Sequence, residues 1–267
     1  MALPEYEYRG MKAACWDLLR GDTSTWPDRP FYFAVIQRSG TPVLDVGCGT
    51  GRLLLDFLGA GVDIHGVDNS PEMLDLCRHK ALRLGLQPVL FEQQMEELDL
   101  PHRYRTIIVP SSSFQLVTHT DAAARAMRGF FRHLEPGGIL LMPFMLLGPR
   151  PGQSGDAEDE WKLVQEAARP EDGAIVRRWA RATYDVANQL EHTEDRYEVI
   201  RGNEIIDSEY QTRSDATRWY TQQQAARLFG VSGFTDVRVV SSFTEEIATA
   251  EDTVFSVFGT RPVANLS

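Results

Sequence analysis

Cysteine is scarce in this sequence: Cys15, Cys48 and Cys77 are the only three in 267 residues. So few cysteines, spaced so widely, cannot build the disulfide framework that stabilises small secreted proteins. The chain also has neither a Cys-x-x-Cys pair nor a His-Glu-x-x-His segment, so the sequence predicts no metal site.

Long hydrophobic runs are absent as well. The longest, at 139–147, is nine residues and is interrupted by Pro143. A helix needs about 20 apolar residues to cross a bilayer. The first residues show neither the basic patch nor the apolar run of a secretory signal. We therefore expect a cytoplasmic protein without a membrane segment.

Positive charge is in deficit. The sequence has 27 lysines and arginines against 38 aspartates and glutamates, which gives a net charge of −11. Proteins that bind nucleic acid or anionic membranes usually present a basic surface, so neither is expected as a partner. Hydrophobic residues make up 43% of the chain, which is enough to form a large hydrophobic core and excludes wholesale disorder. The oligomeric state stays open, and a homo-oligomer is compatible with the sequence.

The order of apolar runs and helical patterns predicts an α/β fold. Short apolar runs alternate with amphipathic segments up to residue 144, which is typical of parallel strands joined by crossover helices. Ser70 before Pro71 is typical of a helix start, and Thr221 with Gln224 has capping-box spacing. We predict a doubly wound, Rossmann-like sheet of about seven strands, mostly parallel, with an antiparallel pair at the end. Strands are expected at 43–46, 64–67, 89–91, 106–109, 139–142, 237–240 and 253–258, and helices at 52–60, 71–83, 120–133 and 221–229.

The helical pattern stops after residue 147. A polar loop rich in glycine, proline and acidic residues is followed by alternating polar and apolar residues, with turn signals at Gly173 and Gly202. This pattern predicts an antiparallel insertion of three or four strands over one edge of the main sheet. The segment before the core is unusually aromatic and is expected to form a lid. The predicted parts are an amino-terminal helical lid at 1–40, an α/β core at 41–147 and 214–267, and an antiparallel insertion at 148–213 that covers the substrate side.

The segment from Asp45 to Gly51, Asp-Val-Gly-Cys-Gly-Thr-Gly, stands between a predicted strand and a predicted helix. Closely spaced glycines let a ligand approach the backbone, and the helix start offers free N–H groups. Two common nucleotide loops do not fit. A dinucleotide-binding loop has its third glycine where this chain has Arg52, and the Gly-Lys-Ser/Thr end of a phosphate-binding loop is missing. The acid before the first glycine favours a cationic ligand over a pyrophosphate. A purely structural turn, or a loop for another nucleotide, stays open at this point.

The second predicted strand ends at Asp68. An acid in this place accepts hydrogen bonds from the two hydroxyls of a ribose in many nucleoside sites. Ser70 is the better cap for the next helix, which leaves Asp68 to the ribose. The alternative is an acid that is solvated or caps the helix itself.

Together these segments resemble the class I S-adenosylmethionine-dependent methyltransferases, over about residues 40–260. The resemblance implies S-adenosyl-L-methionine as cofactor and a small-molecule acceptor. A nucleic-acid substrate is not expected, because the Asn/Asp-Pro-Pro-aromatic motif of nucleic-acid methyltransferases does not follow the fourth predicted strand. The segments that carry it are 43–51, 66–73, 94–98, 106–114, 134–139, 218–221 and 232–234.

The resemblance assigns a role to each matching position. It places the loop glycines and Cys48 at the methionine moiety, Asp45 near the ammonium group and Asp68 on the ribose. Gln94 stands where the family often has an acid, so its contact with the adenine amino group is open. The remaining positions implied for the cofactor are Gly47, Gly49 and Gly51 in the loop, Asn69 and Met73 near the adenosine, Met95 and Glu96 beside adenine, Pro110, Ser111 and Ser112 beneath the sulfonium, and Tyr6 from the lid.

For the acceptor we expect Tyr8, Phe114 and Gln115 to orient or enclose the substrate. The segment from Ser111 to Gln115 has hydroxyls, an aromatic ring and an amide but no strong base, and its serines are as readily explained by backbone hydrogen bonds. An amine needs only to be presented deprotonated, whereas a hydroxyl benefits from a base, so an amine is favoured. The general pattern is similar to N-methyltransferases of specialised metabolism that act on amino sugars. A small-molecule O-methyltransferase and a non-catalytic S-adenosylmethionine-binding protein are the alternatives.

Overall fold

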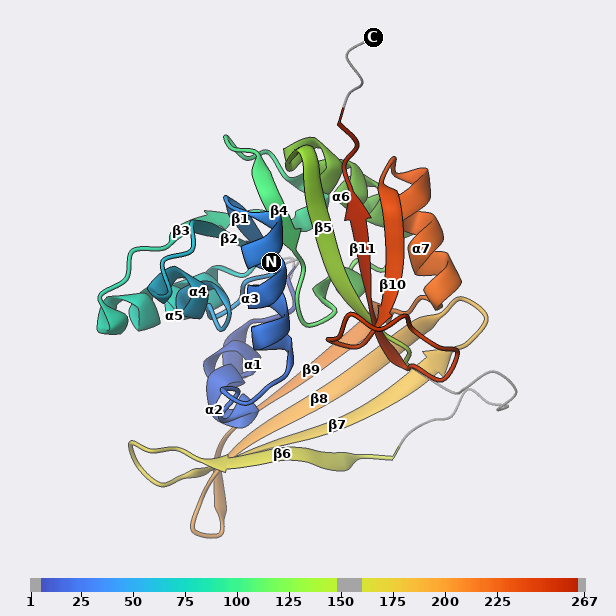
Figure 1. The fold of residues 1–267 in the computed structure, drawn as a ribbon. Coiled ribbons are helices and arrows are strands. Elements are labelled where there is room, and N and C mark those ends of the chain that lie inside the picture. The colour runs from blue at the N-terminus through green and yellow to red at the C-terminus, as the bar shows by residue number, and fades with distance from the viewer. Residues whose placement is uncertain (1–5, 148–159, 264–267) are drawn as a thin grey trace. The chain divides into compact units, whose positions relative to one another are not determined.

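The computed structural model describes residues 6–147 and 160–263, and these form two compact units (Figure 1). One unit comprises Met1–Thr25 with Leu147–Arg218, and the other comprises Trp26–Leu146 with Trp219–Ser267. The expected lid at 1–40 is divided between them, because helix α3 (Asp28–Ser39) buries Tyr32, Val35 and Ile36 in the core of the second unit.

The larger unit is built on a seven-stranded sheet with the order β10-β11-β5-β4-β1-β2-β3. All neighbouring pairs from β5 to β3 are parallel, whereas β11 runs antiparallel to both β5 and β10. The predicted fold class is therefore confirmed. The strands are β1 (Val43–Val46), β2 (Ile64–Asp68), β3 (Val89–Glu92), β4 (Tyr104–Ile108), β5 (Leu134–Met145), β10 (Thr235–Ser241) and β11 (Val254–Thr260).

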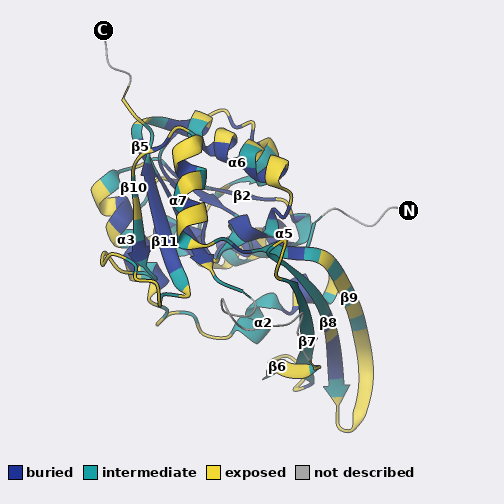
Figure 2. Ribbon diagram, turned by 90° about the vertical axis from the view of Figure 1, so that its right-hand side faces the viewer, coloured by how far each residue is buried: buried dark blue, intermediate teal, exposed yellow. Residues whose placement is uncertain are grey.

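Apolar side chains on both faces of this sheet pack against helices. Val43 belongs to the cluster that α3, α4 (Leu54–Gly59) and α5 (Pro71–Leu84) cover, whereas Leu44 belongs to the cluster covered by α6 (Thr120–His133) and α7 (Gln222–Val231). This alternation is the period of a strand buried on both sides. Figure 2 shows the result, with buried strands beneath the partly exposed helices α6 and α7. None of the helices in the described ranges is long and apolar enough to cross a membrane.

Two helix starts follow the sequence signals closely. The Ser70 hydroxyl accepts a hydrogen bond from the N–H of Met73 at 3.1 Å, at the start of α5. Thr221 and Gln224 form the reciprocal capping box of α7, in which each side chain accepts from the other residue's backbone N–H.

The smaller unit is an antiparallel sheet with the order β6-β7-β8-β9, so the insertion has four strands. Turns occur at Gly173 and Gly202 as the sequence predicts, and a further turn that it did not signal lies at 186–189. Helices α1 (Gly10–Ala14) and α2 (Trp16–Arg20) are joined to this sheet through an apolar cluster that includes Cys15. The strands are β6 (Lys162–Ala168), β7 (Ile175–Asp185), β8 (Leu190–Arg201) and β9 (Glu204–Arg218).

Candidate active site

The glycine loop after β1 has the conformation that its sequence requires. Gly47, Gly49 and Gly51 all have left-handed backbones, with φ of +71°, +54° and +82°, a region that costs other residues about 1–2 kcal/mol. The N–H groups of Gly47 and Cys48 both donate to the carbonyl of Val67, at 2.8 and 3.1 Å. The loop is thus bent back onto the end of β2.

Asp68 is buried at the end of β2 and is already bound to the backbone. Its Oδ2 accepts from the N–H of Gly49 at 2.8 Å, and its Oδ1 accepts from the N–H of Ser70 at 2.9 Å. Burial raises the pKa of this carboxyl, and the N–H bonds oppose the rise. An ionised carboxylate has about four lone-pair positions, so acceptor capacity remains for ribose hydroxyls. Asp68 therefore fits its expected role while also fixing the glycine loop.

Asp45 lies beneath the loop and is only 2% exposed. The N–H of Leu54 hydrogen-bonds its carboxylate, but Oδ1 has no hydrogen-bond partner among the described residues. Burial raises the pKa of Asp45 to about 7; Arg52 opposes this rise, and Asp68 and Asp28 add to it. A buried carboxylate with an open acceptor position fits a cationic ligand, as the sequence predicts.

The loop after β4 contains two consecutive left-handed residues. Ser111 and Ser112 both have φ of +56°, which is uncommon outside glycine and marks a backbone held under local strain. Ser113 donates its hydroxyl to the carbonyl of Pro110 at 2.7 Å. A side chain at Gly47 would approach the Ser113 Oγ to 2.9 Å, so the loops after β1 and β4 lie in contact.

The residues expected at the adenosine follow β2 and β3. Asn69 is exposed, whereas Met73 is buried on the first turn of α5. Gln94, Met95 and Glu96 are half-buried in and before the short 3-10 helix η1 (Met95–Glu97). The sheet order β4-β1-β2-β3 therefore brings all the expected cofactor loops to the carboxyl ends of four adjacent parallel strands, which is where ligands bind in doubly wound folds.

Phe114 and Gln115 hold this end of the unit together. The Gln115 amide bonds both backbone groups of Met145: Nε2 donates to the carbonyl at 3.0 Å and Oε1 accepts from the N–H at 2.7 Å. Phe114 is fully buried and packs against Phe144 and Tyr220. Both residues thus have structural contacts, and their action on an acceptor stays a prediction. Tyr220 was not singled out from the sequence, although the matching segment 218–221 contains it.

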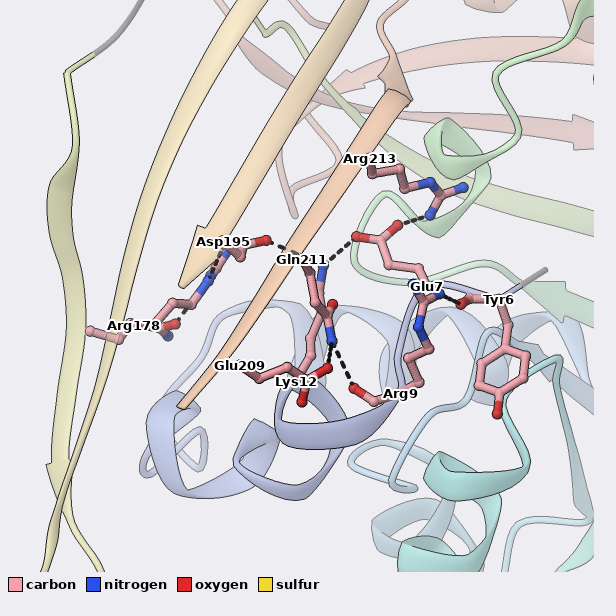
Figure 3. Close-up of polar contacts among 10 residues, drawn as sticks. Tyr6, Glu7, Arg9, Lys12, Arg178, Asp195, Glu209, Gln211 and Arg213 are labelled. Carbon is pink, nitrogen blue, oxygen red and sulfur yellow. Dashed lines mark hydrogen bonds and ion pairs between the residues drawn. The ribbon is translucent and has the colours of Figure 1, made fainter. Parts of the chain in front are cut away.

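Tyr6 and Tyr8 belong to the smaller unit, and Figure 3 shows Tyr6 beside Glu7. The Tyr8 ring packs edge-on against Trp16 with 4.8 Å between ring centroids, and the Lys12 ammonium lies 5.2 Å from the centroid of the same ring. The backbone carbonyl of Tyr6 accepts from Arg9 at 3.0 Å. Contacts of the two tyrosines with cofactor or acceptor stay predictions.

A buried ionic network ties this amino-terminal segment to strands β7, β8 and β9 (Figure 3). Glu7 pairs with Lys12 at 2.5 Å and also with Arg213. Asp195, on β8, accepts from Arg178 at 2.8 Å and lies 3.6 Å from the Lys12 ammonium. Each carboxylate of the network lies between two cations, and these pairings offset the cost of removing the charges from water.

Sequence reasoning missed a second ionic group, in the larger unit beside the glycine loop. Arg52 binds Asp28 with both terminal nitrogens, one of them at 3.0 Å, and its guanidinium lies 5.1 Å from the ring centroid of Trp26. The hydroxyl of Tyr32 is buried without a hydrogen-bond partner in the described chain. The sequence signal that could have pointed to this group is the position of Arg52, directly after the last glycine of the loop.

Metal ligands are not grouped in the described ranges: no cluster of three or more histidines, cysteines and acids is arranged to hold an ion there. The features at the strand ends are instead a glycine loop, two buried acids and a strained polar loop.

The strands that carry the site also match known proteins. Residues 43–138 match a family described as a methyltransferase domain. The chain is 31% identical over 103 residues to a cypemycin N-terminal methyltransferase of a Streptomyces species, which covers 39% of this chain and 41% of that protein. It is 32% identical over 113 residues to a dTDP-3-amino-3,4,6-trideoxy-alpha-D-glucopyranose N,N-dimethyltransferase of Streptomyces venezuelae, which covers 41% and 46%. These matches span less than half the length of either relative.

A solved structure is similar over nearly the whole chain. A sugar N-methyltransferase of a Streptoalloteichus species superposes with a TM-score of 0.66 at 20% identity, covering 98% of this chain and 99% of that one. At this identity the likeness concerns the fold, and it extends to both units. Residues 43–138 therefore match a methyltransferase domain, and the sheet that carries them has the fold of a solved methyltransferase.

Proposed function

We propose that this protein transfers a methyl group from S-adenosylmethionine to the nitrogen of a small-molecule amine. The observation that carries the proposal is the open Oδ1 of Asp45 beneath a loop of left-handed glycines, next to Asp68. Such a site fits a ligand with a cationic amino group at one end and a ribose at the other. Pyrophosphate would be repelled by both acids.

The cofactor supplies a methyl group on a positively charged sulfur; the nitrogen lone pair forms the new N–C bond as the S–C bond breaks, and the nitrogen releases a proton. Displacement of this kind needs the nucleophile close to the methyl carbon and in line with the leaving group. The task of this chain is therefore positioning. Asp45 and Asp68 would fix the two ends of the cofactor, and the loop from Pro110 to Ser112 would support its sulfonium.

An amine is favoured over a hydroxyl for a chemical reason. No strong base lies among residues 110–115, and Gln115, the amide in this segment, is engaged by Met145. An amine presented in its neutral form needs no base before it attacks. Of the similar proteins, one is named as a cypemycin N-terminal methyltransferase and another as an N,N-dimethyltransferase of a dTDP-linked amino sugar.

Binding and turnover together test the proposal. Calorimetric titration with S-adenosylmethionine and S-adenosylhomocysteine should show micromolar binding of both. A panel of amino sugar nucleotides, amino acids and short peptides, with phenols and alcohols in parallel, should then give labelled product from an amine. Absence of binding would refute the cofactor assignment. Binding without turnover on any acceptor would support a non-catalytic protein, and methylation of phenols alone would favour an O-methyltransferase.

A further inference from the structure

Four aromatic rings form a connected group beyond the carboxyl end of β4. The ring of Phe144, near the end of β5, stacks on that of Phe255 with 5.6 Å between centroids. Phe114 and Tyr220 meet the Phe144 ring edge-on, at 6.1 and 5.6 Å, and contact one another at 6.0 Å. The three phenylalanines are 0% exposed, whereas Tyr220 is only half-buried. Tyr220 is therefore the ring through which this group reaches the surface.

The sheet order separates the two sides of the expected cofactor site. Asp68, the proposed ribose acceptor, ends β2 on one side of β1, and β4 lies on the other side. The loop after β4 meets the glycine loop there, because a side chain at Gly47 would approach the Ser113 Oγ to 2.9 Å. The chain order reverses between β1 and β4, which is where ligands bind in doubly wound folds. An acceptor that reaches the cofactor from the side away from its ribose would therefore lie over β4 and β5, where the four rings are.

The two residues expected to meet the acceptor from this part of the chain have almost no accessible surface. Phe114 is 0% exposed and Gln115 is 1% exposed. The Gln115 amide is also engaged by both backbone groups of Met145, at 3.0 and 2.7 Å. Tyr220, which packs on the Phe114 ring, has the accessible surface that Phe114 lacks. A substrate that approaches this group of rings would therefore touch Tyr220.

The position of Tyr220 is fixed both at its ring and at its backbone. The ring packs against two fully buried rings, and the backbone directly precedes Thr221, the N-cap of α7. In the capping box of that helix the Thr221 N–H donates to Gln224 at 2.8 Å. Side chains held by packing next to a rigid element keep the geometry that selective binding needs. Tyr220 is thus both accessible and held in place.

We propose that Tyr220 contacts the acceptor and selects for an amine, with the accessible part of its ring packed beside the reacting nitrogen. Phe114 and Phe144 act through Tyr220 and are positioning residues. This inference rests on the proposed function and adds a residue to the acceptor side of that site.

The chemistry of an aromatic ring explains the preference for an amine. The face of a ring attracts a cation that lies within about 6 Å of it, and an alkylamine in neutral water is mostly cationic before it gives up its proton to water. The nitrogen becomes positive again as the new N–C bond forms, so the attraction is kept in the transition state. A neutral alcohol gains no such attraction when it binds.

Two variants separate the ring from its hydroxyl. Tyr220→Phe keeps the ring and should leave the KM for the acceptor within about threefold of the wild-type value. Tyr220→Leu removes the ring and should raise this KM about tenfold with little change in kcat, because a contact made equally in the ground state and the transition state contributes to KM alone. Affinity for S-adenosylhomocysteine should change less than about twofold in both variants, since the ring lies on the acceptor side.

The experiment uses the amine that the wild type methylates fastest among the amino sugar nucleotides, amino acids and short peptides of the panel. Initial rates at saturating S-adenosylmethionine give KM and kcat, and calorimetric titration with S-adenosylhomocysteine counts the folded molecules. The analogue with a hydroxyl in place of that amino group is measured as a competitive inhibitor, and Tyr220→Leu should weaken it less than about threefold. An equal loss for the amine and the alcohol would overturn the selection for amines.

Phe131→Leu is the matched control. Phe131 packs against the same hydrophobic cluster, is also half-buried and lies edge-on to Phe234 at 5.3 Å. It belongs to the last turn of α6, just before β5 begins, and so to the opposite end of the sheet. In urea this variant should lose stability as Tyr220→Leu does, and it should keep the acceptor KM of the wild type.

The outcomes separate this inference from the proposed function. An unchanged acceptor KM in Tyr220→Leu, or an equal rise in Phe131→Leu, would overturn the role of Tyr220, because a merely structural ring affects stability alone. If Tyr220→Leu folds poorly, Tyr220→Trp takes its place: a ring of different size should change the relative kcat/KM among the amines of the panel by about threefold or more, and an unchanged profile would count against the proposal. If the wild type methylates no amine of the panel, the proposed function itself fails, and this inference with it.

Discussion

Gly49 donates its backbone N–H to the carboxylate of Asp68 over 2.8 Å. The middle of the glycine loop is therefore fixed to the end of β2 by this side chain. Asp68, which we propose as the ribose acceptor, also holds the shape of the loop, so a change at this residue should affect both.

Asp68→Ala should abolish measurable binding of S-adenosylhomocysteine in calorimetry. The change removes both the expected ribose acceptor and the anchors of the loop at Gly49 and Ser70. Asp63→Ala is the control, because this acid lies just before β2 with its side chain 65% exposed. Affinity close to that of the wild type in Asp68→Ala would contradict the ribose assignment.

Gly49 and Gly51 of the loop should differ in their tolerance of alanine. A Cβ at Gly51 would lie 2.6 Å from the Cys77 sulfur and 2.9 Å from Leu55, both buried, whereas at Gly49 its nearest neighbour is the flexible end of Met73 at 3.3 Å. We expect Gly51→Ala to lower the free energy of unfolding by about 3 kcal/mol or more, since backbone strain adds to overpacking. Urea denaturation measures the difference.

Gly61→Ala separates the two causes. Gly61 has φ of +83°, close to that of Gly51, but a Cβ there would meet nothing within 4 Å. It should cost only the backbone strain, about 1–2 kcal/mol. If Gly51→Ala costs no more than Gly61→Ala, the close packing against Cys77 is not the constraint.

Stability should fall as pH rises from about 4 to about 7, in part through Asp45. Burial raises the pKa of this carboxyl from 3.8 to about 7, against the pull of Arg52. In that window the folded state holds a proton that the unfolded state has released, so raising the pH favours unfolding. The full pKa shift corresponds to a change in the free energy of unfolding on the order of 4 kcal/mol.

Asp45→Asn should remove this part of the pH dependence. Urea unfolding of variant and wild type at several pH values from 4 to 8 measures it: the stability of the variant relative to the wild type should increase with pH and level off above about 7. Asp63→Asn, at an exposed position, serves as the control. A constant difference across the range would show that folding does not raise the pKa of Asp45.

Glu7→Gln should loosen the amino-terminal segment from its sheet. Glu7 is 12% exposed and pairs with Lys12 and Arg213, so the change leaves two cations with one fewer partner. Opening of α1 and α2 should become easier by about 2 kcal/mol, seen as faster amide hydrogen exchange in residues 10–20. Glu166→Gln, which removes the exposed pair with Arg177, should change exchange little. Equal exchange in both variants would show that the Glu7 pairs do not hold the segment.

Much of the fold was predictable because its signals are local. The start of α5 at Ser70 and Pro71, its left-handed end at Gly85, and the capping box at Thr221 each depend on a few neighbouring residues. Strand β5 begins earlier than expected, at Leu134, which pairs with Tyr104 on β4. The predicted turn remains as an irregularity in the strand: the next pair is Ile139 with Thr106, and Gly137 between them has φ of +77°.

The candidate site divides in the same way. Asp45, Asp68 and the loop glycines were identified because they lie near the ends of β1 and β2 or in the loop that follows β1. Asp28 was not identified, since its pairing with Arg52 exists only after α3 packs on the sheet. Gln115 was predicted as an acceptor contact from its polarity, and nothing local indicates that Met145, 30 residues later, occupies its amide.

Strand β11 carries a consequence for how the protein is made. It lies between β5 and β10 and pairs with both, although β5 ends at Met145 and β11 begins at Val254. While the chain is being synthesised, β5 therefore presents an unpaired edge until residues near 260 have left the ribosome. Open edges recruit strands of other chains, so nascent or truncated molecules that end before β11 should be prone to aggregation and should depend on chaperones for protection.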